Sequence, residues 1–69
     1  MYTFTIFVAV VCGNPGIPGN GSTTVTSDTV GSTANHACDE GFNLDGVSER
    51  MCLPNGSWSD ALPTCVSKL

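Results

Sequence analysis

The sequence predicts a small all-β domain held together by disulfide bonds, and three observations lead to this prediction. The chain has 69 residues, enough for one domain but too few to bury a large hydrophobic core. It carries four cysteines, an even number, as a disulfide framework requires. Charged residues make up only 12% of the chain, and the abundance of Gly, Ser, Thr, Asn and Pro favours short strands and turns over helices.

The first segment, Met1–Val11, is apolar and uncharged, and its length suits the apolar part of a secretory leader. It is too short to span a bilayer, which takes about 20 residues. Because a leader usually begins with Lys or Arg and this segment has neither, the alternative is the end of an upstream β-rich segment or the start of a fragment. We expect a leader over residues 1–11, with the domain beginning at Cys12.

The next residues predict short strands joined by close turns. Cys12–Gly21 contains two prolines and four glycines, so it is expected to be extended and turn-rich rather than paired in a sheet. Thr23–Thr29 is rich in β-branched residues and suits an edge strand or a loop. The run from position 31 to Cys38 alternates as a strand does, which places Ala34 and His36 on the same face as this cysteine.

A hairpin is predicted in the middle of the chain. After a turn at positions 39–41, Phe42 and Leu44 form a short apolar strand. The dipeptide Asp45-Gly46 is a strong hairpin signal, so Val47–Leu53 is expected to be the return strand.

The segment between Cys52 and Cys65 contains the only tryptophan, Trp58, and a second hairpin signal at Asn55-Gly56. A tryptophan can bury roughly 200 Å², so Trp58 is expected to form the core. Phe42 and Leu44 are the other predicted core residues. We expect Cys52 and Cys65 to hold opposite ends of the domain, with the tryptophan between them. Four cysteines allow three pairings, and the residues alone leave the choice open.

The order and spacing of these residues resemble the sushi family, also called complement control protein modules or short consensus repeats. The resemblance covers Cys12 to about Val66, and its most specific parts are Gly-Ser-Trp-Ser before the last cysteine, Pro-Thr-Cys at the end, and the early Pro-Gly-Ile-Pro-Gly-Asn-Gly. The full set of matching positions is Cys12, Pro15, Asn20, Gly21, Gly31, Cys38, Gly41, Leu44, Gly46, Cys52, Gly56, Trp58, Ser59, Pro63 and Cys65.

This resemblance implies a compact, elongated β-sandwich-like module over residues 12–66, with residues 67–69 as a tail. It implies that Cys12 bonds to Cys52 and Cys38 to Cys65. Two departures stand out. His36 occupies a position, two before the second cysteine, that is usually a buried Tyr or Phe in this family. Sushi modules usually occur in tandem, and no second module follows here, so we expect a fragment or an isolated copy.

Metal binding is not favoured by the spacing of the candidate ligands. The four cysteines lie 26, 14 and 13 positions apart, whereas zinc sites usually use close C-x₂₋₄-C pairs. Asp39, Asn43 and Asp45 resemble part of a calcium loop, but Gly41 interrupts the spacing and Arg50 occupies the position of a closing Glu. We therefore expect no metal and no other cofactor.

Catalysis and polyanion binding also lack the residues they need. His36 is the only histidine, and it lies two residues from a cysteine expected to be oxidised, so a Cys-His nucleophile is not expected. No nucleophile-elbow motif accompanies the serines. The net charge is −4, with Arg50 and Lys68 the only basic residues. This argues against nucleic acids, heparin-like polyanions and anionic membranes as main ligands. We also expect no membrane insertion by the module itself.

Two Asn-x-Ser sequons, at Asn20 and Asn55, lie in predicted turns and are candidate glycosylation sites. In both, the Asn-Gly pair could instead serve turn geometry alone. The acidic turn around Asp39 and Glu40 is a solvated surface or a contact for a basic partner.

The expected function is a non-catalytic, secreted or extracellular protein–protein recognition module, one module of a larger protein with tandem sushi neighbours. By resemblance its partners would be complement-type proteins, adhesion receptors or cytokines. The alternatives are a structural spacer and an accessory module of a secreted enzyme.

Overall fold

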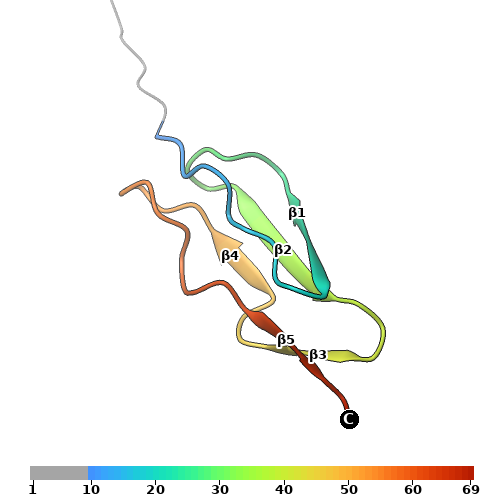
Figure 1. Cartoon of the computed structure of the whole chain (residues 1–69). Coiled ribbons are helices and arrows are strands. Elements are labelled where there is room, and N and C mark those ends of the chain that lie inside the picture. The colour runs from blue at the N-terminus through green and yellow to red at the C-terminus, as the bar shows by residue number, and fades with distance from the viewer. Residues whose placement is uncertain (1–9) are drawn as a thin grey trace, which may run out of the picture.

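The computed structural model describes residues 10–69, which fold into two antiparallel sheets and no helix (Figure 1). The leader predicted over Met1–Val11 therefore lies almost wholly outside the described residues. No helix in the described part of the chain is long and apolar enough to cross a membrane. The strands are β1 (Gly21–Val25), β2 (Thr33–Cys38), β3 (Phe42–Asp45), β4 (Glu49–Met51) and β5 (Thr64–Ser67). The predicted small all-β fold with two disulfides is confirmed.

The larger sheet has the order β1-β2-β4, so β2 is its central strand. The predicted alternation of β2 is present: Ala34 and His36 are buried, while Asn35 and Ala37 between them are exposed. β1 pairs with β2 over its whole length, from Gly21 opposite Cys38 to Val25 opposite Ala34. An alternating strand with neighbours on both sides thus provides the inner face on which the core is built.

The predicted hairpin between positions 42–44 and 47–53 is wrong. β3 pairs with β5, with Leu44 opposite Cys65, and β4 pairs with β2, with Arg50 opposite Ala34. Gly46, with φ of 120°, lies at the point where the chain passes from one sheet to the other. The ladder between β2 and β4 continues to this crossing, since the His36 N–H donates to the Ser48 carbonyl at 2.7 Å.

The predicted turn at Asn55-Gly56 is present. The Leu53 N–H donates to the Ser57 carbonyl at 2.8 Å, and Cys52 forms an antiparallel bridge with Trp58. Gly56 has φ of 87°, a left-handed conformation that suits glycine. This turn folds the chain back so that the tryptophan returns to the inner face of β4.

The N-terminal segment, residues 12–19, is extended as predicted and crosses the face of the larger sheet (Figure 1). It is attached by the Thr23 hydroxyl, which donates to the Gly16 carbonyl at 2.8 Å, and by the buried Pro18. Just before it, Val11 forms an isolated bridge with Thr29. At the other end, β5 includes Ser67 and the Lys68 N–H donates to the Gly41 carbonyl at 3.0 Å.

Candidate functional site

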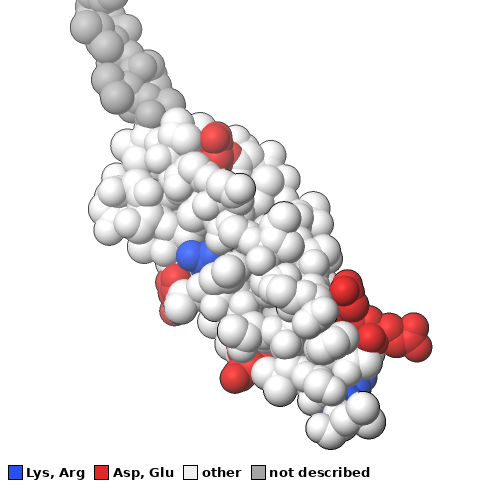
Figure 2. Space-filling model, viewed as in Figure 1, with Lys and Arg blue, Asp and Glu red and all other residues white. Residues whose placement is uncertain are grey.

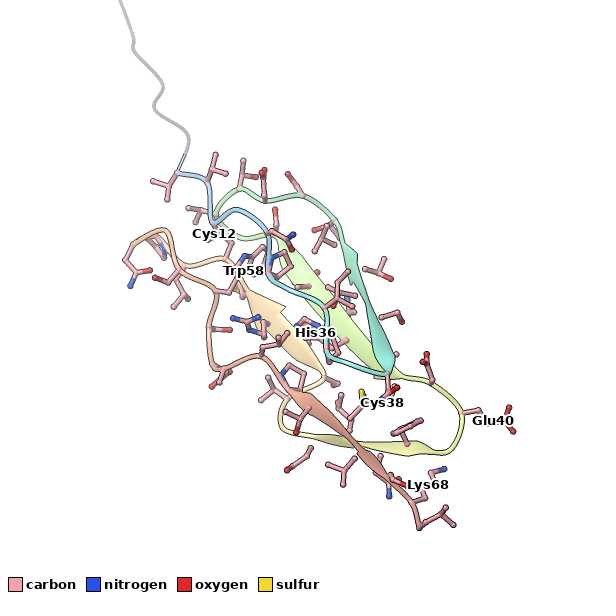
Figure 3. The ribbon with its side chains drawn as sticks, viewed as in Figure 1. Cys12, His36, Cys38, Glu40, Trp58 and Lys68 are labelled. Atoms are coloured by element: carbon pink, nitrogen blue, oxygen red, sulfur yellow. A yellow bond between two sulfur atoms is a disulfide. The ribbon has the colours of Figure 1, made fainter. Side chains whose placement is uncertain are left out.

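The two disulfides fix opposite ends of the module. Cys12 is bonded to Cys52 and Cys38 to Cys65, which are the pairs that the family resemblance implies. Figure 3 shows Cys12 and Trp58 close together toward one end, and Cys38 toward the other. The two bonds join positions 40 and 27 residues apart in the sequence, so each constrains a long stretch of chain.

Trp58 is 9% exposed and lies with Ala34 and Cys52 in the buried hydrophobic cluster, against which the half-buried Cys12 packs. Its indole Nε1 donates a hydrogen bond to the Gly13 carbonyl at 3.0 Å. The ring therefore fills the core and also holds the N-terminal segment in place.

Phe42 and Leu44, the other two predicted core residues, are only half-buried and do not belong to this cluster. Both lie on β3 in the two-stranded sheet, whereas the cluster is built on β2, β4 and the turn that follows. The buried cluster is therefore formed without these two residues, which lie on the smaller sheet.

His36 is 4% exposed on β2, and its hydrogen bonds define its tautomer. Its Nδ1 lies 2.8 Å from the Thr23 hydroxyl oxygen, and that hydroxyl already donates its single hydrogen to the Gly16 carbonyl. Nδ1 must then carry the proton and donate to Thr23. The other ring nitrogen, Nε2, is buried and has no hydrogen-bond partner among the described residues.

The pKa of His36 is lowered from its ordinary value, first by burial of the ring and second by the positive charge of Arg50. The neutral ring is therefore the form that the fold stabilises. A buried neutral histidine bonded to a threonine is a structural residue of the inner face.

Arg50 is a buried residue that stabilises the core, a role that was not predicted from the sequence. It is 8% exposed, and its guanidinium donates only to backbone carbonyls: Nε to Ser59 at 2.9 Å, Nη1 to Pro15 at 2.8 Å and Nη2 to Asp60 at 3.3 Å. A signal for this was present, because Arg50 precedes Cys52 by two residues and alternation places both on one face of the strand.

The two sequon asparagines are exposed. Asn20 precedes β1 and has φ of 60°, and its carbonyl accepts from the Asp39 N–H at 2.8 Å. The Asn55 Oδ1 accepts from the Ser57 N–H at 2.9 Å, which closes a local turn. Glycosylation of either site stays a prediction.

The three residues considered for calcium lie on β3 and in the turn before it. Asn43 and Asp45 project from the exposed side of β3, and Asp39 lies in the preceding turn. Within residues 10–69, no group of three or more His, Cys, Asp or Glu side chains could hold a metal ion. Figure 2 shows acidic atoms over this turn, and Figure 3 shows Glu40 extending outward from it.

A shallow groove of about 440 Å³ lies between the N-terminal segment and the end of β1. We call it the β1 groove; its lining residues are Gly13, Asn14, Pro15, Val25, Ser27 and Asp28. Its walls are mostly apolar or backbone, and Asp28 is its only charged residue. Sequence reasoning did not find the groove, because its two walls come from segments at least ten positions apart in the sequence.

The family model of the Sushi repeat (SCR repeat) matches residues 12–65. The chain is 43% identical over 61 residues to rat (Rattus norvegicus) "Sushi, von Willebrand factor type A, EGF and pentraxin domain-containing protein 1", covering 88% of this chain and 2% of the relative. It is 41% identical over 54 residues to human (Homo sapiens) C4b-binding protein beta chain, covering 78% and 21%.

Dog (Canis lupus familiaris) E-selectin is 37% identical over 62 residues, which cover 83% of this chain and 10% of the relative. The chain thus spans only 2% to 21% of the length of these three relatives. The matched region runs from the first to the last of the four disulfide-bonded cysteines. The chain belongs to the sushi repeat family.

Proposed function

We propose that this chain is a non-catalytic, extracellular protein–protein recognition module and that it works as one module of a larger protein. The observation that carries the proposal is that its chemically versatile side chains serve the fold itself. All four cysteines are in disulfides, His36 is bonded to Thr23, and Arg50 is bonded to backbone carbonyls.

The surface segments then provide the contacts. Two disulfides and the buried Trp58 hold the frame, while most residues of the segments 20–28 and 39–45 are exposed or half-buried at the surface. A rigid frame with exposed segments binds partners at low entropic cost, because little has to be ordered on association.

The relatives support a protein ligand and an extracellular location. The name of human C4b-binding protein beta chain states that it binds C4b, and guinea pig (Cavia porcellus) "Zona pellucida sperm-binding protein 3 receptor" is 39% identical over 59 residues. Disulfides persist in oxidising compartments, which supports secretion or display on the extracellular face of a membrane protein. Tandem sushi neighbours would extend the same frame along the parent protein.

The test is a binding screen of the oxidised chain, displayed multivalently, against an array of extracellular protein domains. Two variants place a glycan wedge on different segments. Thr24→Asn makes an Asn-Val-Thr acceptor on the exposed side of β1, and Asp45→Thr makes an Asn-Leu-Thr acceptor on β3. Recognition predicts at least one partner that is lost on reduction and alkylation and that one wedge blocks while the other does not.

The spacer alternative predicts the opposite result. A pure spacer would bind nothing in the screen, and neither wedge would change any interaction of the parent protein. That outcome would refute recognition and leave rigidity as the role of the module.

A further inference from the structure

We propose that the β1 groove and the free edge of β1 together bind an extended segment of a partner protein that carries a lysine or arginine side chain. This inference deepens the proposed recognition function and rests on it. It names the surface, the backbone conformation of the partner and the charge of the side chain that enters the groove.

The two outer edges of the larger sheet differ in what covers them. The outer edge of β4 is occupied by the segment after the Asn55-Gly56 turn: the Ser59 N–H donates to the Met51 carbonyl at 2.8 Å, and the Met51 N–H donates to the Ser59 hydroxyl at 2.9 Å. At the other side of the sheet, β1 pairs only with β2 among residues 10–69. An uncovered strand edge is a template for strand addition.

The hydrogen bonds at the two ends of β1 show which of its backbone groups point away from β2. The Thr26 N–H donates to the Thr33 carbonyl, and the Asn20 carbonyl accepts from the Asp39 N–H. These bonds fix the phase of the ladder, so the even-numbered residues of β1 face β2 with their N–H and C=O groups. The odd-numbered residues, including Thr23 and Val25, direct theirs outward, and within residues 10–69 no other backbone group bonds to them.

The outer edge of β1 lacks the residues that usually protect an exposed strand edge. Residues 20–27 contain no charge and no proline, the features that commonly blunt an exposed edge. The β1 groove begins at Val25, the last residue of β1. A segment paired along the edge would therefore run directly to the groove.

The walls of the β1 groove are fixed by hydrogen bonds from residues in or beside the core. The carbonyls of Gly13, Pro15 and Asp28 accept hydrogen bonds from the Trp58 indole at 3.0 Å, from Arg50 at 2.8 Å and from the Cys12 N–H at 2.7 Å. All three donors come from core residues or from the disulfide packed on the core. The groove is thus preformed, and binding in it would require little reordering.

The β1 groove carries one negative charge, on Asp28. Asp28 forms no ion pair with any described residue. The guanidinium of Arg50 is buried and donates its hydrogen bonds to backbone carbonyls. Pro15 and Val25 provide an apolar wall for an aliphatic side-chain stem. A mostly apolar groove whose lining includes one carboxylate without an ion pair fits a Lys or Arg side chain, which has an apolar stem and a cationic head.

The test is an NMR titration of the isotope-labelled, oxidised chain with capped synthetic peptides. The probe is Gly-Ser-Thr-Val-Lys-Val-Thr-Ser-Gly, and its matched control has Glu in place of Lys. At low salt we expect shifts at the amides of Thr23, Val25 and Asp28, slower amide exchange at the first two, and binding about two- to fivefold tighter for the lysine peptide, as exposed ion pairs give. High salt should remove this preference.

Protein and peptide variants separate the two parts of the proposal. Asp28→Asn should abolish the preference for lysine, whereas Asp45→Asn, the same charge change on β3, should keep it. N-methylation of the peptide valines should abolish binding, because it removes the donors for strand pairing.

The proposal is overturned if neither peptide shifts the β1 amides, or if Asp45→Asn removes the lysine preference and Asp28→Asn does not. It is also overturned if the N-methylated peptide binds as well as the parent. The proposed function would fail on a different result, namely that the binding screen finds no extracellular partner. A partner blocked only by the Asp45→Thr wedge would leave recognition intact and refute this surface.

Discussion

At the scale of the residue, the unpartnered Nε2 of His36 makes the module sensitive to acid. Protonation would place a hydrogen on a buried nitrogen that has no acceptor, close to the charge of Arg50. Because the pKa of His36 is lower in the folded state than in the unfolded chain, the unfolded state binds a proton first as pH falls. We expect stability to be constant above about pH 7 and to decrease as pH falls below about 6.5, the unperturbed pKa of histidine.

This prediction is checked by urea unfolding between pH 8 and pH 5. His36→Phe restores the aromatic type usual at this position and cannot titrate, so its midpoint should change less over the same range. An equal decrease in both proteins would show that other groups, such as the carboxylates, cause the effect.

Trp58 has two separable roles, and two substitutions distinguish them. Trp58→Ala removes the largest member of the core cluster and should cost about 3–5 kcal/mol of unfolding free energy. Trp58→Phe keeps an aromatic ring but leaves the Gly13 carbonyl without its donor, which should cost about 1–3 kcal/mol. Chemical denaturation of the oxidised proteins measures both. A Trp58→Ala protein with an unchanged midpoint would contradict the assignment of this residue to the core.

At the scale of the element, the pairing of β1 with β2 depends on Gly21. A Cβ at this position would lie 2.5 Å from the Ala37 carbonyl oxygen, 2.8 Å from the Cys65 sulfur and 3.0 Å from the Pro18 ring. None of these atoms is the free end of a flexible side chain. We therefore expect Gly21→Ala to destabilise the module by about 1–3 kcal/mol or more, as overpacking does.

Gly19→Ala is the matched control, because nothing lies within 4 Å of a Cβ at Gly19. It should change stability by no more than about 1 kcal/mol, with stabilisation the expected sign, since alanine reduces the entropy of the unfolded chain. Thermal melts of the two variants compare them directly. Equal melting temperatures would show that β1 can move away from its neighbours at little cost.

The elements also show what can and cannot be predicted from this sequence. The alternation of β2 and the turn at Asn55-Gly56 are local features, and both were predicted correctly. The partners of β3 and β4 were not, because the Asp45-Gly46 dipeptide signals a turn but not which strand the chain meets afterwards. Strand pairing between residues 42–45 and 64–67 is nonlocal and leaves no mark in either segment.

The candidate site follows the same rule. The role of Trp58 was predictable from its position between two cysteines, whereas the burial of Arg50 required knowing that β4 lies against β2. The β1 groove was not predictable, because it depends on how the N-terminal segment crosses the sheet.

At the scale of the whole molecule, stability depends on the disulfides, since the buried hydrophobic cluster within residues 10–69 contains only Ala34, Cys52 and Trp58. The chain-entropy model gives about 4 kcal/mol for the bond that joins residues 40 apart and about 3.5 kcal/mol for the bond that joins residues 27 apart. Loop length alone would make the two bonds nearly equal. The core makes them unequal, because Cys52 is 1% exposed within the cluster and Cys12 packs against it, whereas Cys38 and Cys65 are half-buried outside it.

We therefore predict that Cys12→Ala/Cys52→Ala unfolds the module at room temperature, while Cys38→Ala/Cys65→Ala leaves a destabilised but folded larger sheet. The dispersion of amide NMR signals measures this directly, with the Trp58 indole signal reporting the core. In the second variant that signal should keep its folded position while signals from β3 and β5 move toward random-coil values. If both variants lose all dispersion, the two sheets fold as one unit and either disulfide is indispensable. If the first variant stays folded, the hydrophobic cluster does not depend on the Cys12–Cys52 bond beside it. The walls of the β1 groove, which accept hydrogen bonds from core residues, would then be expected to survive reduction of that disulfide.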